Sequence, residues 1–600
     1  IRGGTVVDGT GSPPFQADVC IRDGVIDAVG PDLSAPEGAQ VMDAAGKLIT
    51  PGFINMHSHS DCSAAMYPNM ESTLGQGITT EFAGHCGLGV APVQHSWLYM
   101  FPEKKAFTKV MPEPPGGINP YNAYLVPTQR LREPFAQTYG QELDWTTYGQ
   151  FLEHLRRVGL GANLAVVAGQ AQIRLQAMGT DYHRDATETE IAAMEDALSE
   201  AMDGGALGLS LGLDYEPGLF AGREELLRLM KLVAARGGIV TAHTRSRSHP
   251  YYGHAQSFLD GLREFLDLGR ESGVCIHVSH IQNGYNVTPA HDGLIRAAVA
   301  KTLEELDRAR QAGVNVTWDV IPKYAYGPFH YPMAASLFQP YVERCGGCAA
   351  FSRALTLPDF RRQVVEEIRT GRHPSQGVFT RFDPQADPAW DTRYRFTRVQ
   401  RAGCVGKTIR EAAQGADSLE LLLDVLTEDP YAAMISLGRR PEHTPDRDAF
   451  VARTEATIGL DTWTLDYDAA LSEGDLPLEC GSPATYEGMT VFLETERDKG
   501  AAIEETIRKL TGNAARTLGL TDRGFVSQGL AADLLVLDWE HFSARENLAD
   551  PRHGPQGLDY VLVAGQIAVD HGVHTHVRSG TVLGPEHRLS LIHISEPTRR

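Results

Sequence analysis

The sequence predicts an α/β protein: a closed (β/α)8 TIM-like barrel, with a small β-sandwich domain formed by both chain ends and a large insertion between strands 7 and 8. Three observations carry this prediction. Eight short apolar runs typical of buried strands occur in the middle of the 600-residue chain. Segments with the apolar period of helices lie between most of them, such as "TETEIAAMEDALSEAMDGG" at 187–205. Short alternating runs with turn signals occupy both chain ends.

The two chain ends are expected to form one discontinuous β domain from residues 1–50 and 523–575. The first segment alternates β-branched residues with Asp-Gly and Gly-Ser turns, and the second contains "YVLVAGQIAVDHGVHT" in the same style. Each segment is too short to bury a core alone. We therefore expect their strands to pair with each other.

The barrel is predicted over residues 51–522. Its expected strands, in chain order, are 52–59, 77–86, 163–170, 205–213, 238–243, 273–280, 313–320 and 455–461. The connection between the last two is far longer than usual and contains helical segments such as "LPDFRRQVVEEIRTG". Residues 321–454 are therefore interpreted as a folded insertion or lid over the mouth of the barrel. Residues 589–600 fit neither pattern and are interpreted as a non-native or disordered tail.

The composition argues against nucleic-acid and membrane partners and bears on the cellular compartment. A net charge of -22 argues against a nucleic-acid surface. No run of about 18 apolar residues occurs, so no transmembrane helix and no membrane partner are expected. The eight cysteines are sparse and mostly isolated, which favours reduced thiols and a cytoplasmic setting. Because the chain starts at Ile1 without an initiator methionine, the native N-terminus is taken to be missing and export stays open. The oligomeric state is not predicted.

Residues able to bind a metal close five of the eight expected strands. In barrels of this kind the active site lies at the carboxyl ends of the strands, so residues there are candidate ligands. His57 and His59 alternate with Ser58 and therefore point the same way from the end of the first strand. Imidazole, thiolate and carboxylate are the usual ligands of zinc, and six such groups can converge on one centre. The six are His57, His59, Cys86, His243, His280 and Asp461.

The same stretches give the chain a resemblance to the amidohydrolase superfamily and, within it, to the N-acyl-D-amino-acid deacylases, or D-aminoacylases. The resemblance covers most of residues 1–575. It rests on "PGFINMHSHSD", "GITTEFAGHCGLGVAP", "GALGLSLGLDYEPGLF", "TAHTRSR", "IHVSHIQ", "GKTIREAA", "IGLD" and "LTGNAARTLGLTDRGFVSQGLAADLLVLD".

This resemblance implies a zinc-dependent hydrolase in which metal-activated water attacks the amide C–N bond of a small N-acyl substrate. It implies that Cys86, His243 and His280 hold the tighter zinc ion. His57 and His59 then contribute to a second, weaker metal position. Asp461 is implied to be the catalytic base and is counted among the metal ligands. A carboxylate within hydrogen-bond reach can take the proton of the attacking water and deliver it to the leaving nitrogen.

The substrate pocket departs from the family pattern. Deacylases of this group hold the substrate carboxylate with a lysine two residues after the second metal histidine, where this chain has Gln282. In "DVIPKYAYGP", Ile321 and Lys323 stand where tyrosines are usual, and "GSPATYEG" lacks the expected arginine. We expect retained catalytic machinery with a rebuilt pocket. The candidate substrate-binding residues are Gln282, Lys323, Tyr324, Tyr326 and Arg174.

Two alternatives compete with amide hydrolysis. The same metal site could hydrolyse a cyclic amide, a carbamate, a lactone or an ester, because barrels of this kind host many chemistries. A non-catalytic scaffold descended from such enzymes would have lost metal ligands, whereas all six are present. The sequence leaves the substrate, its chirality and the number of metal ions in the active form open.

Overall fold

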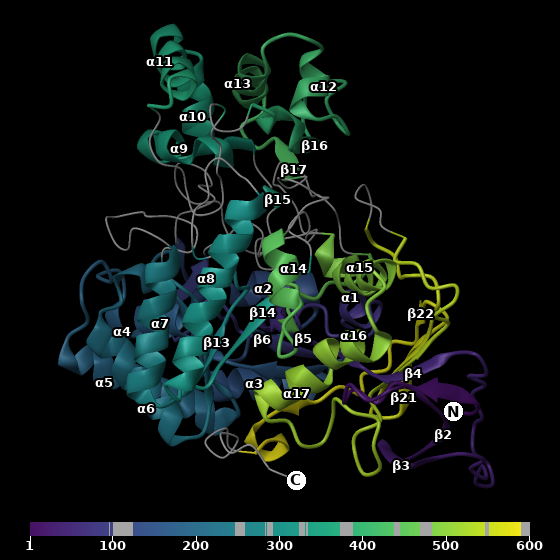
Figure 1. Ribbon diagram of the computed structural model, residues 1–600. Helices are drawn as coiled ribbons and strands as arrows, with labels where there is room; N and C mark the ends of the chain where they lie inside the picture. The colour runs from purple at the N-terminus through teal and green to yellow at the C-terminus, as the bar shows by residue number, and fades with distance from the viewer. Residues whose placement is uncertain are drawn as a thin grey trace.

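The computed structural model describes residues 1–94, 96–99, 124–245, 258–282, 284, 292–322, 330–331, 334–372, 384, 388–436, 445–468, 483–545 and 551–589. Figure 1 shows a barrel surrounded by helices, a sheet at one side that contains the N-terminus, and a helical unit above the barrel.

Parallel strands form the barrel, and their side chains are almost all buried. They are β5 (Phe53–Ser58), β6 (Ile78–Ala83), β9 (Asn163–Val166) with its continuation β10 (Ala168–Gly169), β11 (Gly208–Gly212), β12 (Ile239–His243), β13 (Cys275–Val278), β14 (Val316–Val320) and β18 (Thr457–Ile458). One group pairs in the order β5-β6-β9 and the other in the order β10-β11-β12-β13-β14-β18.

Backbone hydrogen bonds join these two groups into a closed ring. The N–H of Leu207 donates to the carbonyl of Val166 at 2.7 Å, beside the interruption between β9 and β10. On the other side, the N–H of Asp461 donates to the carbonyl of His57 at 2.9 Å and the N–H of His59 donates to Thr462 at 2.6 Å. Each predicted strand range contains one of these strands, so the predicted barrel is confirmed.

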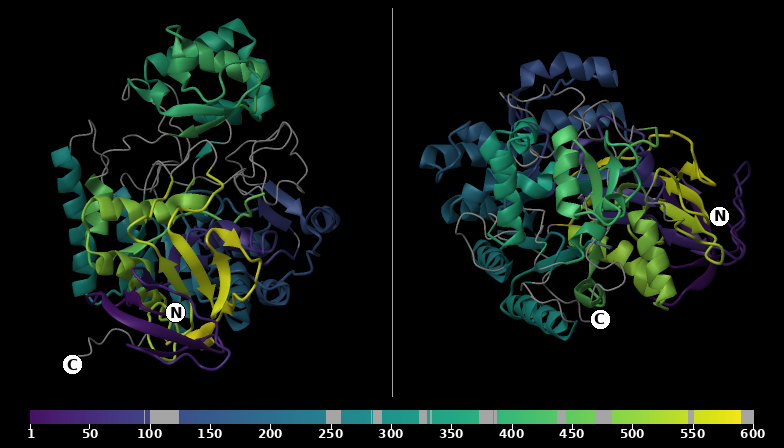
Figure 2. Two further views of the ribbon diagram at one scale, coloured as in Figure 1. Left: turned by 90° about the vertical axis from the view of Figure 1, so that its right-hand side faces the viewer. Right: turned by 90° about the horizontal axis from the view of Figure 1, so that it is seen from above.

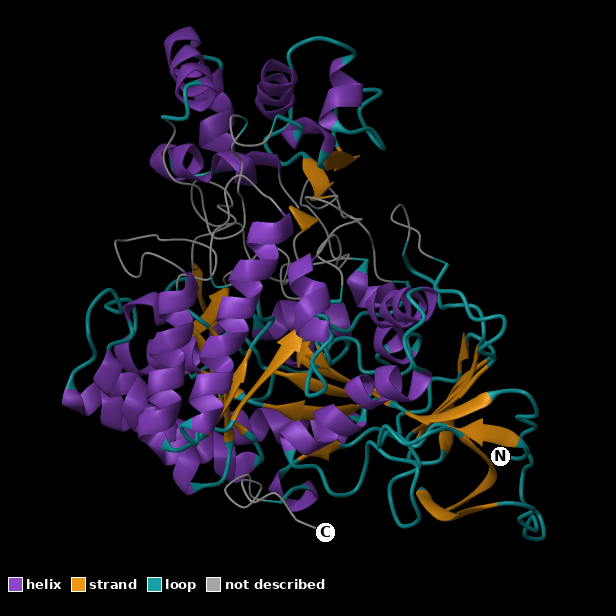
Figure 3. Cartoon of the chain, viewed as in Figure 1, coloured by secondary structure: helices purple, strands orange, loops and turns teal. Residues whose placement is uncertain are grey.

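Helices pack around the strands, as Figure 3 shows. In α5 (Glu188–Gly204), Thr187 and Glu190 form a reciprocal capping box, and Gly205 ends the helix with a φ of 122°. This helix matches the predicted segment 187–205. The others are α1 (Glu71–Leu74), α2 (Arg132–Tyr139), α3 (Tyr148–Val158), α4 (Gln170–Met178), α6 (Arg223–Ala235), α7 (Phe258–Ser272), α8 (Asp292–Gln311), α14 (Pro445–Val451), α15 (Ala484–Asp498), α16 (Ile503–Leu510) and α17 (Gly512–Leu518). A hairpin of β7 (Ser96–Tyr99) and β8 (Tyr124–Pro127) precedes α2.

Strands from both chain ends share one eight-stranded sheet. Its order is β22-β21-β20-β19-β4-β1-β2-β3. The strands are β1 (Gly4–Val6), β2 (Phe15–Arg22), β3 (Val25–Gly30), β4 (Leu48–Pro51), β19 (Leu534–Leu537), β20 (Leu558–Val563), β21 (Gln566–Asp570) and β22 (Val573–His574). The two ends meet where β4 pairs antiparallel with β19, and a bridge between Val25 and Ala531 brings the edge strand β3 back toward the residues before β19. Figure 2 shows the N-terminal and C-terminal strands side by side. A short strand, β23 (Val582–Leu583), instead pairs with β9 of the barrel.

The segment between β14 and α14 carries a hydrophobic core of its own, separate from that of the barrel. Phe338, Phe351, Phe396 and Leu422 are among its fully buried members. Its elements are β15 (His330–Tyr331), α9 (Gln339–Cys345), α10 (Cys348–Leu355), α11 (Pro358–Arg369), β16 (Tyr394–Arg398), α12 (Ile409–Ala413), α13 (Ser418–Glu428) and β17 (Ala433–Ser436). The unit leaves the barrel after β14, at the carboxyl end of a strand, and stands above the barrel in Figures 1 and 2. Its role as a lid stays a prediction, as do the exact domain boundaries.

Among the described residues, no helix combines the length and the apolar character needed to cross a membrane.

Candidate metal centre

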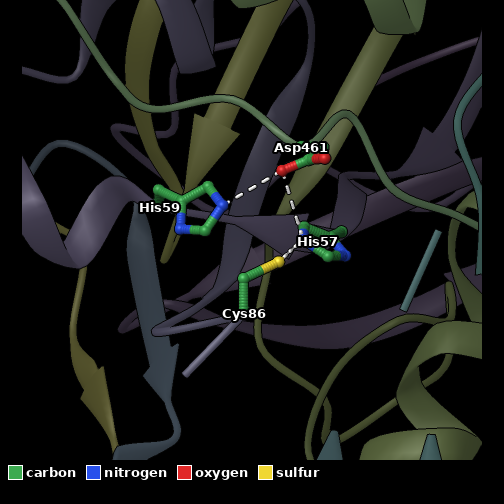
Figure 4. Close-up of side chains that lie close together, drawn as sticks. All are labelled: His57, His59, Cys86 and Asp461. Atoms are coloured by element: carbon green, nitrogen blue, oxygen red, sulfur yellow. Dashed lines mark hydrogen bonds and ion pairs between the residues drawn. The ribbon is translucent and has the colours of Figure 1, made fainter. Parts of the chain in front are cut away.

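The six predicted ligand side chains converge at the carboxyl ends of the barrel strands. His57 lies near the end of β5, His243 closes β12, and His59, Cys86, His280 and Asp461 lie on the turns just after β5, β6, β13 and β18. None of the six is more than 5% exposed. Their donor atoms form two groups that share Cys86, and within each group all the atoms lie within 4.8 Å of one another. One group consists of His57, His59, Cys86 and Asp461 and is drawn in Figure 4. The other group consists of Cys86, His243 and His280.

The distances show how closely the two groups are joined. The Sγ of Cys86 lies 3.4 Å from Nε2 of His57 and 3.4 Å from Nε2 of His280. One oxygen of Asp461, Oδ1, lies 3.0 Å from Nε2 of His59 and 3.3 Å from Nε2 of His57. The other oxygen, Oδ2, lies 3.9 Å from Nε2 of His280. Cys86, which follows β6, and Asp461, which follows β18, therefore each lie close to both His57 and His280.

Burial and charge act in opposite directions on these groups. Burial raises the pKa of Cys86, but the charges of His57 and His280 and hydrogen bonds from His243 and His280 outweigh it, so the pKa falls well below its usual value. Burial likewise raises the pKa of Asp461, but the charge and hydrogen bond of His57 and the hydrogen bond of His59 lower it well below its usual range. The site thus favours a thiolate beside a carboxylate, both facing positively charged imidazole groups, and a metal cation can supply that positive charge instead.

The donor set fits a divalent metal ion. A buried thiolate, a buried carboxylate and several imidazoles held together away from water are costly unless they are paired or bind a metal. Thiolate, imidazole and carboxylate are the three ligand types that zinc takes in proteins. The Cys86, His243 and His280 group has the three protein ligands typical of a catalytic zinc site, which keeps a further position for water or substrate.

Three further buried groups, which sequence reasoning missed, contact these ligands. Asp319, the fourth residue of β14, accepts from Nδ1 of His57 at 3.3 Å. Asp214 lies on the turn after β11, with Oδ2 3.3 Å from Nε2 of His243. The ring of His85 lies 4.1 Å from that of His57, between centroids. A signal was available for each: an aspartate inside or just after an apolar strand, and a histidine next to a predicted ligand.

The predicted substrate-binding residues on the loops are only partly described. Gln282 follows His280 by two residues, as the sequence alone dictates, and is half-buried. Lys323, Tyr324 and Tyr326 lie outside the described residues.

Arg174 has a different environment from the one predicted. It lies in α4, is fully buried, and forms an ion pair with Glu225. Its guanidinium also donates to the carbonyls of Tyr182, Arg184 and Phe220. Its charge is balanced by Glu225, and its contacts tie together the loops that follow the third and fourth barrel strands; its role in substrate binding stays a prediction.

Comparisons with known proteins agree with this architecture. A model of the amidohydrolase family matches residues 40–315. The chain is 30% identical over 586 residues to a D-aminoacylase of Alcaligenes xylosoxydans xylosoxydans, covering 97% of this chain and 96% of that protein. It is 27% identical over 589 residues to an N-acyl-D-glutamate deacylase of the same organism, with 97% and 96% covered.

Solved structures show the same fold. A D-aminoacylase crystal structure aligns with a TM-score of 0.66 at 24% identity, covering 97% of this chain and 99% of that one. An N-acyl-D-glutamate deacylase from Bordetella bronchiseptica, complexed with zinc and a phosphonate inhibitor, aligns with a TM-score of 0.65 at 24% identity, with 97% and 98% covered.

Proposed function

This chain belongs to the amidohydrolase family and, within it, groups with the D-aminoacylases. From that premise we propose that it is a zinc-dependent deacylase of N-acyl amino acids or related N-acyl compounds, with a rebuilt substrate pocket. The observation that supports this most is the pair of buried donor groups that share Cys86. Cys86, His243 and His280 would hold the tighter zinc ion, and His57 and His59 would contribute to a weaker second position. A zinc ion held there lowers the pKa of a water molecule and polarises the carbonyl group of the substrate.

Asp461 is the proposed proton carrier of this reaction. Its carboxylate lies within 4.8 Å of the donor atoms of His57, His59 and Cys86 and is almost fully buried, so bulk water does not compete for the proton. Its lowered pKa keeps the carboxyl group of Asp461 ionised, which a proton acceptor requires. It takes the proton of the water that attacks the amide carbon, and then gives that proton to the nitrogen as the C–N bond breaks. The products are a carboxylic acid and an amine.

Gln282 carries the proposal that the pocket is rebuilt. A neutral amide cannot balance the carboxylate of an N-acyl amino acid as a lysine does, and a desolvated carboxylate without a cation is costly. We therefore expect weak turnover of ordinary N-acyl-D-amino acids, unless another cation takes over this role. Lys323 is the candidate for that relocated cation. Gln282→Lys should then raise kcat/KM for these substrates above that of the unmodified protein.

One substrate panel tests the proposed function. Zinc-reconstituted protein is assayed against N-acyl-D-amino acids, N-acyl-L-amino acids, simple esters and carbamates. Release of amine from at least one N-acyl compound, lost on removal of zinc, is the expected result. Turnover confined to esters or carbamates would contradict amide hydrolysis, and protein that binds no transition metal would contradict the metal centre.

The variant Asp461→Asn tests whether Asp461 acts in catalysis or only supports the fold. The asparagine is nearly isosteric but cannot carry the proton, so kcat should fall about a hundredfold to ten-thousandfold while the fold and most bound zinc remain. The fall should appear in kcat far more than in KM, since proton transfer occurs in the transition state. Asp203→Asn, an exposed aspartate in α5, is the matched control. Turnover within a few fold of normal together with a lowered melting temperature would show that Asp461 is not the base.

A further inference from the structure

Asp319 lies in β14 and is fully buried, and it connects three barrel strands through one carboxylate. Its Oδ1 lies 3.3 Å from Nδ1 of His57 in β5 and 3.0 Å from Nε2 of His277 in β13. Its Oδ2 accepts the backbone N–H of His280 at 2.9 Å. Both oxygens are therefore used, and two of the three groups that they contact are candidate metal ligands.

The carboxylate dictates which nitrogen of each imidazole carries hydrogen. An ionised carboxylate can only accept, so the nitrogen that faces it must be a donor. In His277, the opposite nitrogen Nδ1 lies 2.8 Å from the hydroxyl of Thr317, which can donate to it. In His57, a hydrogen on Nδ1 leaves the lone pair of Nε2 free. That Nε2 is the atom that faces Cys86 and Asp461.

Asp319 also holds the turn that presents His280. His280 has a φ of 39°, in the left-handed region that a non-glycine residue adopts at a cost. The side chain of Asp319 accepts from the N–H of His280, and its backbone carbonyl accepts from the N–H of Ile281 at 2.8 Å. Two consecutive N–H groups of this strained turn are thus fixed by one residue.

The glycine at position 459 makes room for this arrangement. A Cβ atom at Gly459 would lie 2.4 Å from Cβ of His57 and 2.6 Å from Oδ2 of Asp319. Any larger side chain there would push His57 and Asp319 apart. Gly459 therefore offers a way to disturb the contact while the carboxylate itself is retained.

We propose that Asp319 is a positioning residue of the candidate metal centre: it fixes the imidazole of His57 with Nε2 free for a metal and holds the backbone turn that presents His280. This inference rests on the proposed metal-dependent function. Carboxylates that orient metal-binding histidines typically contribute about 10- to 100-fold to metal affinity.

The test measures zinc affinity and the protonated nitrogen of His57. In Asp319→Asn, the amide nitrogen cannot accept the hydrogen bond that it faces, so at least one contact is lost while the shape is kept. Zinc affinity, from competition with a chromophoric chelator, should fall about 10- to 100-fold. In metal-free protein labelled with 15N-histidine, at a pH high enough for the His57 imidazole to be neutral, the hydrogen of His57 should lie on Nδ1, and Asp319→Asn should shift the signal toward the Nε2-protonated form. Signals are assigned with His57→Gln.

A matched control separates positioning from general loss of structure. Asp533 is another buried aspartate, paired with Arg523 at 2.7 Å, outside the candidate site. Asp533→Asn should lower the melting temperature but leave zinc affinity within about twofold of the unmodified protein. If Asp319→Asn does not fold, Gly459→Ala provides the same measurements with the carboxylate present.

The outcomes divide as follows. Equal zinc affinity in Asp319→Asn and unmodified protein, an equal loss in Asp533→Asn, or an unchanged His57 signal would each overturn the inference. Unmodified protein that binds no zinc would instead overturn the proposed function itself, so the two failures are distinguishable.

Discussion

Glu81→Gln should remove a pH-dependent loss of folding stability that arises when the buried side chain of Glu81, near the candidate site, ionises. Glu81 lies in β6 and is 3% exposed. Its oxygens accept from Nδ2 of Asn55 at 2.8 Å and from the hydroxyl of Thr73 at 2.9 Å. Asn55 in turn accepts the N–H of Leu460 at 2.9 Å, across the closure of the barrel. Burial raises the pKa of Glu81 from 4.5 to about 7, against the hydrogen bonds from Thr73, Ser58 and Asn55, which lower it.

The size and sign of the effect follow from this pKa. Each pKa unit corresponds to about 1.4 kcal/mol, so a rise from 4.5 to about 7 corresponds to roughly 3 kcal/mol. Between these two values the unfolded chain has lost the Glu81 proton and the folded protein still binds it. The folded state therefore loses stability as the pH rises through this window, and the loss levels off above about pH 7. From about pH 5 to about pH 8, the expected loss is roughly 2 to 3 kcal/mol.

Urea denaturation of the unmodified protein and of Glu81→Gln, across this pH range, measures the effect. Excess chelator is present throughout, because metal binding would add its own pH dependence. The neutral amide mimics the protonated acid, so the variant should gain stability relative to the unmodified protein by roughly 2 to 3 kcal/mol as the pH rises. Glu153→Gln, on the exposed face of α3, is the control for loss of a surface charge. A stability difference for Glu81→Gln that stays constant with pH would refute the argument.

Three further predictions concern the metal ligands and the scaffold. Cys86→Ala should empty the tighter zinc position, because it removes the thiolate of the group formed by Cys86, His243 and His280. His59→Ala should chiefly loosen the second position. Zinc content after gel filtration distinguishes the two variants, and equal losses of zinc would contradict the assignment. Arg174→Met should lower the free energy of unfolding by about 3 to 5 kcal/mol, because it leaves the carboxylate of Glu225 buried without its cation. A melting temperature close to that of the unmodified protein would argue against this. Thr147→Ala should cost about 1 kcal/mol, measured in urea, because it removes the N-cap of α3, and unchanged stability would mean that the cap contributes nothing in solution.

The barrel could be predicted because its strands are buried on both faces. Such strands are continuous apolar runs, which the sequence shows directly, and Gly205 and its equivalents mark where the helices stop. The break between β9 and β10 had no such mark, because Val167, between them, is as apolar as its neighbours. Pairing between the two chain ends is predicted, but the particular pair, β4 with β19, depends on contacts across nearly the whole chain, which local patterns do not encode.

The sequence predicts those residues of the candidate site that lie at the ends of strands. His57, Cys86 and Asp461 lie at strand ends, and they converge because the carboxyl ends of the barrel strands meet at one face of the barrel. Asp319 and Arg174 differ because their roles depend on a partner. The partner of Asp319 is 262 residues away in the sequence, and that of Arg174 is 51 residues away. Sequence pattern gives the position of such a residue in the fold but not the charge that it meets there.

Backbone strain at the candidate ligands explains why the barrel and the site cannot be separated. Cys86, His280 and Asp461 have φ values of 59°, 39° and 56°, a conformation that costs a non-glycine residue of order 1 to 3 kcal/mol. Each strained turn is held by a hydrogen bond from another element. The hydroxyl of Tyr215 donates to the carbonyl of Cys86 at 2.6 Å, Asp319 accepts from the N–H of His280, and a β5 carbonyl accepts from the N–H of Asp461. The bond to Asp461 is also one of those that close the barrel. The strain that turns these side chains toward one centre is therefore sustained by the contacts that complete the fold, and metal affinity and folding stability should change together when those contacts are broken.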